Sequence, residues 1–417
     1  MKIVDEIKPI KMAVIFDQII AAGGGYQQAL NAAILVNKIN KKYCDPVFFT
    51  TYRENITTLR VHNINVIFLN IPRWRRLFLK IRGAIPSRRL ITVIIKLIGF
   101  NSFEKPLLER EVDLVYFISP SIWALYLERL NFITTVWDLC HRDYPEFPEV
   151  RADRIFEQRE QGYRQSLIKS TAILTDSKLG KENIISRYGV DKNRVHVMPF
   201  SAATHIENFT NKKIDRSINI REKYGIDDEY IIYPAKFWPH KNHVYILHGL
   251  NLLYKNYGVS LKAVFVGSDA LAGTLDYVKK TAEKIGILDN IFFLGYVEDE
   301  DLAYLYKESI ALVMPTYFGP TNIPPLEAFT LGVPVLYSNL DGLREQVGDA
   351  ALLMDLNNPE SMASHLDKLI NDDDLKNNLT IKGRAQLNKY DDKYRLEIIE
   401  GICIDFQSKR YSWGSYK

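Results

Sequence analysis

The apolar residues of this chain fall into short runs that alternate along its length with segments of helical period. Such alternation is typical of βαβ units, in which each strand of a parallel sheet is followed by a helix. In the first half the pattern predicts strands at 12–16, 46–49, 65–69, 114–118, 133–136, 172–175 and 195–198. In the second half it predicts strands at 230–233, 261–266, 291–294, 311–314, 333–337 and 351–354. We therefore expect an α/β protein with doubly wound parallel sheets.

The two halves are separated by residues 200–228, a polar segment rich in Asn, Lys, Ser and Thr. A chain of 417 residues is also long for a single hydrophobic core. The pattern therefore predicts two Rossmann-like domains, at 1–200 and 229–390, joined by a connection at 201–228. The amphipathic residues after 390 predict a C-terminal helix and tail at 391–417.

Composition narrows the class of protein. Hydrophobic residues make up 47% of the chain and charged residues 25%, and the net charge of +4 is too small to indicate a nucleic-acid partner. The cysteines Cys44, Cys140 and Cys403 are far apart, which fits neither a disulfide framework nor a zinc site and favours a reducing compartment. We find no leader peptide and no apolar run long enough to span a membrane, and so expect a cytoplasmic protein.

The clearest chemistry lies in residues 315–335, where a predicted strand runs into a loop rich in Gly and Pro. Pro324 and Pro325 favour the first turn of a helix, where a missing N–H costs nothing. Glu327 lies in that turn, and Gly332 ends the helix. Free backbone N–H groups at a helix N-terminus bind phosphate, and a carboxylate beside them can bind sugar hydroxyls. An ordinary strand–loop–helix connection with one capping Glu explains the same residues equally well.

These residues resemble the donor-sugar loop of family 4 retaining glycosyltransferases, which are group 1 glycosyltransferases of GT-B fold. The positions that match the family pattern are Pro324, Leu326, Glu327, Ala328, Gly332, Pro334 and Val335. One position departs from it, because Gly319 stands where the family has a Glu that touches the donor hexose. By the resemblance, Glu327 holds the nucleotide ribose. The residues that bind the β-phosphate or the sugar would be Thr321, Asn322 and Ile323.

A second match lies upstream, in residues 236–242, which follow the strand predicted from residue 230. They resemble the family pattern Arg-x-x-x-x-Lys-(Gly or Asn), with Lys236 in place of the Arg and Lys241 followed by Asn242. Two cations at the end of a strand can neutralise the charge on a departing nucleoside diphosphate. Lys keeps the charge of Arg but loses its bidentate geometry. Two solvated surface lysines are the alternative interpretation.

Three consecutive glycines, Gly23, Gly24 and Gly25, follow the first predicted strand. Glycines let backbone N–H groups approach an anion at a helix N-terminus. The spacing is not Gly-x-Gly-x-x-Gly and no acid follows at the distance expected for NAD ribose, which argues against a dinucleotide oxidoreductase. The turn resembles the Gly-Gly loop that family members place over the donor phosphates or the acceptor. A flexible turn without a ligand is the alternative.

The strand predicted at 133–136 ends at Trp137, where family members often have a His that borders the reacting sugar. Asp138 and His141 are the polar groups nearby, and we expect them to face the sugar from the first domain. In the alternative interpretation Trp137 belongs to the core and His141 to an ordinary loop.

Two further turns carry weaker signals. Gly267 and the pair Tyr296 and Val297 resemble family turns that surround the nucleotide base with backbone groups. The chain has no Asp-x-Asp pair placed to hold a divalent cation. We therefore expect no metal and no cofactor, with a nucleoside diphosphate sugar as the donor substrate.

The resemblance implies a retaining glycosyltransferase that moves a hexosyl group from this donor to a growing, lipid-linked surface glycan, such as a bacterial O-antigen or capsule. It implies two domains that face a cleft, an acceptor-binding first domain, a donor-binding second domain, and a C-terminal helix that crosses back to the first. It also implies that the departing phosphate takes the acceptor's proton. A nucleotide-sugar epimerase or phosphorylase of the same fold remains an alternative, as does a non-catalytic glycan-binding protein, because of Gly319.

Residues 73–96 contain eight Arg or Lys and no acid, interleaved with bulky apolar residues. Basic amphipathic segments of this kind bind anionic membrane surfaces. This segment would hold a cytoplasmic enzyme peripherally on the inner face of the cell membrane. The alternative is a helix that packs into the first domain with one solvated face.

We predict that the chain sediments with anionic vesicles at low salt. Binding should fall as salt rises to physiological strength, because the charged contacts are screened. Replacing Arg75, Arg76, Arg88 and Arg89 with Ser should release the protein from vesicles while leaving donor binding intact. A wild-type protein that stays in the supernatant at low salt would show that the segment is only a solvated face.

Overall fold

The computed structural model describes residues 8–19, 24–72, 103–211 and 219–413, which fall into two compact units. Unit 1 comprises Met1–Leu139, Arg154–Pro199 and Asp392–Lys417. Unit 2 comprises Cys140–Asp153 and Phe200–Asp391. The basic segment at 73–96 and Gly23 lie outside the described residues.

Unit 1 contains, within the described residues, a parallel sheet of seven strands in the order β3-β2-β1-β4-β5-β6-β7. The strands are β1 (Ile10–Phe16), β2 (Cys44–Thr50), β3 (Val66–Phe68), β4 (Leu114–Phe117), β5 (Asn131–Val136), β6 (Ala172–Thr175) and β7 (Val195–Val197). Met12 and Val14 of β1 belong to one buried cluster, while Ala13 and Ile15 belong to another. Successive side chains of a strand point to opposite faces, so both faces of the sheet are covered.

In the described part of unit 1 the α-helices are α1 (Gly24–Asn37), α2 (Asn55–Val61), α5 (Lys105–Leu108), α8 (Ile155–Ser166), α9 (Lys178–Tyr188) and α19 (Asp392–Arg410). Helix α9 illustrates how the local sequence sets the ends of a helix. The Ser177 side chain caps its N-terminus by accepting from the Gly180 N–H at 3.0 Å, and Gly189 ends it with a left-handed φ of 65°.

Unit 2 contains, in its described part, a parallel sheet of six strands in the order β10-β9-β8-β11-β12-β13. The strands are β8 (Tyr230–Pro234), β9 (Lys262–Val266), β10 (Ile291–Gly295), β11 (Leu312–Met314), β12 (Val335–Ser338) and β13 (Leu352–Met354). The helices are α6 (Cys140–Asp143), α7 (Pro148–Arg151), α10 (Thr204–Asn211), α11 (Ile220–Tyr224), α12 (His243–Tyr257), α13 (Thr274–Lys284), α14 (Asp299–Lys307), α15 (Ile323–Leu331), α16 (Asp341–Val347), α17 (Glu360–Asn371) and α18 (Asp373–Asn388).

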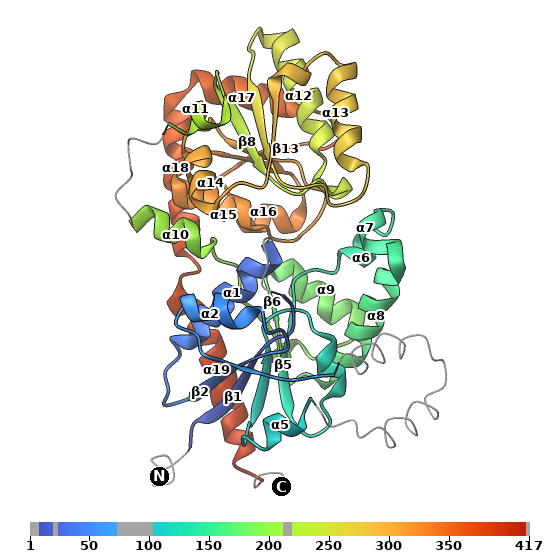
Figure 1. Cartoon of the computed structure of the whole chain (residues 1–417), viewed down its shortest axis with the longest axis vertical. Helices are drawn as coiled ribbons and strands as arrows, with labels where there is room; N and C mark the ends of the chain where they lie inside the picture. The colour runs from blue at the N-terminus through green and yellow to red at the C-terminus, as the bar shows by residue number, and fades with distance from the viewer. Residues whose placement is uncertain (1–7, 20–23, 73–102, 212–218, 414–417) are drawn as a thin grey trace. The chain divides into compact units, whose positions relative to one another are not determined.

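Both sheets reverse their strand order once, between β1 and β4 in unit 1 and between β8 and β11 in unit 2. Figure 1 labels β1 and β8, the strand on one side of each reversal. In doubly wound sheets ligands bind outside the carboxyl ends of the strands at this switch point. The loops that follow β1 and β4, and those that follow β8 and β11, are therefore where the fold favours binding sites.

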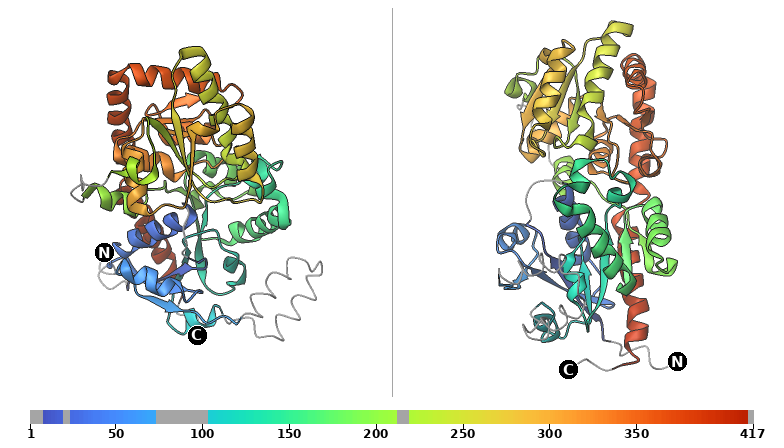
Figure 2. Two further views of the ribbon diagram at one scale, coloured as in Figure 1. Left: turned by 45° about the horizontal axis from the view of Figure 1, so that its top comes forward. Right: turned by 90° about the vertical axis from the view of Figure 1, so that its right-hand side faces the viewer.

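The C-terminal helix α19 belongs to unit 1, as the sequence predicts. It packs against α1 and lies alongside the strands of this unit (Figure 2). Lys38 pairs with Asp392 at 2.7 Å at one end of the helix, and Arg410 pairs with Asp113 at 3.2 Å at the other. Ile399, Ile402, Cys403 and Phe406 fill the core between them.

The predicted strands agree with the structure. Each of the thirteen lies within two residues of an observed strand at both ends, and the prediction of two doubly wound parallel sheets is confirmed. Parallel strands buried on both faces are continuous apolar runs, which makes them easy to recognise in a sequence. Of the helices in the described ranges, none is both long and apolar enough to cross a membrane.

The buried side chain of Glu104 stabilises the turn at residues 128–130 in unit 1. Its Oε1 accepts three backbone N–H groups, from Glu128 at 3.1 Å, Arg129 at 2.7 Å and Leu130 at 2.7 Å. One carboxylate thus satisfies a row of donors that no strand or helix pairs.

We predict that Glu104→Ala destabilises unit 1 by about 2–4 kcal/mol, because three backbone donors lose a charged acceptor. Urea unfolding followed by tryptophan fluorescence measures this, since Trp123 stacks on the neighbouring Phe103 at 4.9 Å. Glu109→Ala is the matched control, because its pair with Lys105 at 3.8 Å is exposed and contributes at most about 1 kcal/mol. Equal unfolding midpoints for the two variants would contradict the prediction.

Candidate functional site

Two loops of unit 2 meet at its switch point. Residues 236–242, the lysine loop, follow β8 and end at Asn242, whose φ of 55° and ψ of 44° are left-handed. Asn and Gly tolerate this conformation best, which explains why the residue after Lys241 is one of these two. Residues 315–322 follow β11 and lead directly into α15.

Hydrogen bonds join the two loops. The His240 carbonyl accepts from the Tyr317 N–H at 2.9 Å and from Thr316 Oγ1 at 3.4 Å. Lys241 Nζ donates to Asn322 Oδ1 at 3.0 Å. The structure thus brings together Lys241 and Asn322, which the sequence predicted for one site across eighty intervening residues.

Asn322 is the N-cap residue of α15, yet its side chain makes no capping bond. Instead, Nδ2 donates to the Tyr337 hydroxyl at 2.7 Å. The Asn322 N–H donates to Gln346 Oε1 at 3.0 Å, and Gln346 Nε2 donates to the Asn322 carbonyl at 2.5 Å. This network directs Oδ1 at Lys241 and leaves the first turn of α15 without a side-chain cap. Pro324 and Pro325 in that turn carry no N–H, so the Ile323 N–H and the dipole of the helix are what this end offers to an anion.

Lys241 carries a charge that nothing in the described structure balances directly. No described carboxylate lies within 4.0 Å of its ammonium group, which is bound to the neutral amide of Asn322. Burial lowers the pKa of Lys241 to about 8, although part of the residue's surface remains exposed, and the Cys140 thiol and Glu149 act in the opposite direction. Lys236 is exposed and makes no side-chain hydrogen bond or ion pair with a described residue.

Glu327 lies in the first turns of α15 and is 6% exposed. The Tyr306 hydroxyl, from α14, donates to Glu327 Oε2 at 2.9 Å. Burial raises the pKa of Glu327 to about 7, against the effect of this hydrogen bond, and Asp299 raises it further. A ligand that donates hydroxyl protons to Glu327 would favour its charged form and lower this pKa.

In the turns that follow β9 and β10, backbone segments pack closely together. A Cβ at Gly267 would lie 2.3 Å from the Ala235 carbonyl oxygen, so only glycine fits between the ends of β8 and β9. The Gly267 N–H donates to the Gly295 carbonyl at 2.8 Å. Tyr296, which follows, is 65% exposed, while Val297 is buried. These predicted residues therefore lie together at the same edge of the sheet as the lysine loop.

In unit 1, Gly24 and Gly25 begin α1, and a Cβ at Gly25 would lie 2.9 Å from the Trp137 ring. The glycine thus serves close packing against Trp137. Asp138 forms an ion pair with Arg159 of α8. His141 is fully buried and belongs to unit 2, so Asp138 and His141 lie in different units.

The sequence analysis missed one carboxylate. Asp17 directly follows β1, and both of its oxygens accept hydrogen bonds, from Ser119 at 3.2 Å and from Ser121 at 2.6 Å. Burial raises its pKa to about 6, against the effect of these two hydrogen bonds. Ser119 and Ser121 follow β4, so the three residues mark the switch point of unit 1. An acid at the end of the first strand was the signal available in the sequence.

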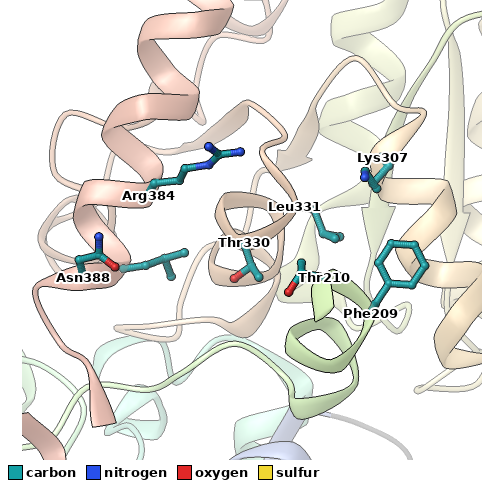
Figure 3. A pocket seen from close by; sticks show the side chains of 8 residues that line it. Phe209, Thr210, Lys307, Thr330, Leu331, Arg384 and Asn388 are labelled. Atoms are coloured by element: carbon teal, nitrogen blue, oxygen red, sulfur yellow. The ribbon is translucent and has the colours of Figure 1, made fainter. Parts of the chain in front are cut away.

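A pocket of about 460 Å³ lies elsewhere in unit 2, and none of the predicted residues lines it (Figure 3). Its walls come from the last turns of α10, α14 and α15 and from α18. The C-terminal end of a helix is electronegative, so Lys307 and Arg384 in this pocket complement three helix ends.

Part of this chain matches a known protein family. Residues 216–386 match the family of glycosyl transferases group 1. The chain is 28% identical over 260 residues to O-antigen chain mannosyltransferase B of Escherichia coli, covering 62% of this chain and 66% of the relative. It is 27% identical over 204 residues to O-antigen chain mannosyltransferase RfbU of Salmonella typhimurium, covering 48% of this chain and 51% of the relative. The chain thus spans between about half and two thirds of the length of these two curated relatives.

Solved structures share the whole fold. Anabaena HepE in complex with UDP and glucose has a TM-score of 0.69 at 15% identity, covering 94% of this chain and 99% of that one. WaaG, a glycosyltransferase involved in lipopolysaccharide biosynthesis, has a TM-score of 0.64 at 15% identity, covering 94% and 99%. The chain therefore has the GT-B fold, and residues 216–386 of unit 2 match the group 1 glycosyl transferases.

Proposed function

We propose that this protein is a retaining family 4 glycosyltransferase. It transfers a hexosyl group from a nucleoside diphosphate sugar to a growing, lipid-linked surface glycan such as an O-antigen or capsule. The observation that carries the proposal is the ammonium group of Lys241, which lies beside the uncapped first turn of α15 without a carboxylate counter-ion in the described structure. A diphosphate supplies the missing negative charge.

The donor roles follow from the positions of the side chains. Lys236 and Lys241 bind the diphosphate, and their charges neutralise the leaving group as the glycosidic bond breaks. Glu327 accepts hydrogen bonds from the ribose hydroxyls. The residues that bind the β-phosphate or the sugar are Thr321, Asn322 and Ile323, and those beside the base are Gly267, Tyr296 and Val297.

Relatives and fold rules suggest the remaining substrates. Several matched relatives are named as O-antigen or serotype-specific mannosyltransferases, which favours mannose as the transferred sugar. The acceptor would bind unit 1, where Asp17 offers a carboxylate at the switch point that can accept a hydroxyl group's hydrogen bond. Gly25 and Asp138 follow neighbouring strands of the same sheet.

In the transfer itself, the bond between the sugar's anomeric carbon and the β-phosphate oxygen breaks. A new bond forms to an acceptor hydroxyl oxygen on the same face of the sugar, and the departing phosphate takes the hydroxyl proton. The enzyme then orients the two substrates and stabilises the charge on the leaving diphosphate. Both effects are strongest when the side chains are already in place before the reaction.

A thermal-shift screen tests the proposal. The protein is mixed in turn with GDP-mannose, UDP-glucose and related nucleotide sugars. We expect one of them to raise its melting temperature and the others to leave it unchanged, because a ligand stabilises the state that it binds. Product analysis with the stabilising donor then distinguishes transfer from epimerisation, since only transfer requires an acceptor. A chain that none of these donors stabilises would argue for the non-catalytic alternative.

We predict that Lys241→Ala weakens nucleoside diphosphate binding about tenfold and slows turnover further, about a hundredfold. Its charge matters most as negative charge develops on the leaving diphosphate. Calorimetry and single-turnover assays separate the two effects. The control is Lys255→Ala, an exposed lysine near the end of α12. Normal turnover in Lys241→Ala would contradict the role given to this residue.

Glu327→Gln should have opposite effects on stability and binding. A carboxyl group whose folded pKa is raised from 4.5 to about 7 stabilises the fold below pH 4.5 and loses that contribution as pH rises through 7. The variant should therefore match the wild type near pH 4.5 and exceed its stability by up to about 3 kcal/mol at pH 8. It should also bind nucleotide more weakly, because the ribose loses a charged acceptor.

Melting temperatures between pH 4.5 and 8 measure the stability difference, and calorimetry measures binding. The control is Glu283→Gln, an exposed glutamate of α13. A Glu327→Gln protein with wild-type stability at pH 8 would show that Glu327 is not held in its neutral form.

A further inference from the structure

One segment of unit 2 is separated in sequence from the rest of that unit. Residues Cys140–Asp153, which include α6 and α7, are compact with unit 2, although the residues before and after them belong to unit 1. The sequence analysis placed this segment in the first domain. We call it the 140–153 strap, and its contacts converge on the lysine loop and on the 315–322 loop.

Glu149 of α7 makes a polar contact between the strap and the lysine loop. Its Oε1 accepts from the His240 backbone N–H at 3.0 Å and lies 2.5 Å from His240 Nδ1. The side chains of Glu149 and His240 are only 6% and 11% exposed. Glu149 therefore binds both the main chain and the side chain of the residue next to Lys241.

Aromatic rings extend this contact to the second loop. The His240 ring stacks on Phe318 with centroids 3.9 Å apart and an angle of 15° between the ring planes. Phe318 in turn stacks on Tyr144 of the strap at 5.8 Å and meets Phe147 edge-on at 5.5 Å. The strap thus contacts both loops: the lysine loop through Glu149, and the 315–322 loop through Tyr144 and Phe147.

Keeping Glu149 charged in this buried position reduces the stability of the fold. Its Oε2 is buried and has no hydrogen-bond partner among the described residues, which destabilises a folded protein. Burial raises the pKa of Glu149, but the hydrogen bonds from His240 outweigh burial and hold that pKa below its usual range. A neutral glutamine could accept the same backbone hydrogen bond, so anchoring the loop does not by itself require a carboxylate.

We propose that Glu149 is a positioning residue of the transfer site: through His240 it fixes the lysine loop, and its negative charge keeps the neighbouring Lys241 ammonium charged and directed at the donor diphosphate. The inference rests on the proposed function. Lys241 lies among Asn322 of the 315–322 loop, Cys140 and Glu149 of the strap, and the histidines His240 and His243 of its own segment. Of these groups, Glu149 is the carboxylate.

The test is a double-mutant cycle between Glu149→Gln and Lys241→Ala, read as the dissociation constants of UDP and GDP between pH 6.5 and 9.5. Glu149→Gln should weaken binding of the preferred nucleotide about fivefold at pH 7.5. It should also move the alkaline loss of binding to lower pH, because Lys241 loses its neighbouring negative charge. In the Lys241→Ala background the same substitution should change affinity less than twofold, since the group through which it acts is gone.

Glu146→Gln is the matched control, because it removes the same charge from an exposed position of the strap. Wild-type affinity and pH dependence in Glu149→Gln would overturn the inference, and so would an equal effect in both backgrounds, which would indicate a structural role only. If Lys241→Ala itself binds nucleotide as well as the wild type, the proposed phosphate site is wrong, and this outcome is distinguishable from failure at Glu149 alone.

Discussion

The arrangement of the two loops of unit 2 depends on one partly buried cation. Lys241 is held by a neutral amide oxygen at 3.0 Å, without a carboxylate close enough for an ion pair in the described structure. Removing an ammonium group from water without a counter-ion is costly, and the lowered pKa is the visible sign of that cost. Three hydrogen bonds fix the loops around it: Asn322 Oδ1 accepts from Lys241, the Tyr317 N–H donates to the His240 carbonyl, and Glu149 accepts from the His240 N–H. These contacts hold the ammonium group in place before any ligand arrives, so that the proposed diphosphate would need little reorganisation of the loops.

Glu327, like Lys241, is a group whose burial disfavours its charged form, although its charge is negative. Its burial favours the neutral form, although its proposed role needs an acceptor of hydroxyl protons. The two groups therefore stabilise the fold less than apolar or neutral groups would at these positions. Functional residues commonly reduce stability in this way, and the sheet that carries them is correspondingly well packed. The fully buried Tyr233, Tyr306 and Tyr337 place large rings directly under the loops.

The strands and the two loops of unit 2 could be predicted because each depends on local sequence. A doubly buried strand is an apolar run, and the ends of neighbouring parallel strands must meet at one edge. The strap could not be predicted, because the contact between Glu149 and His240 spans 91 residues and leaves no periodic signal. For the same reason Asp138 and His141, three residues apart, looked like one site. The structure pairs Asp138 with Arg159 in unit 1 and buries His141 in unit 2.

The turn at Gly319 explains why this chain departs from the family pattern at that position. Its φ of 97° is left-handed, and a Cβ there would approach the Asn322 side chain to 3.3 Å. An acid at this position would strain the turn and disturb the residue that binds Lys241. The conformation of this loop therefore favours glycine over the acidic side chain that the resembled family has at this position. In the proposed function this position therefore contributes no carboxylate to the donor sugar.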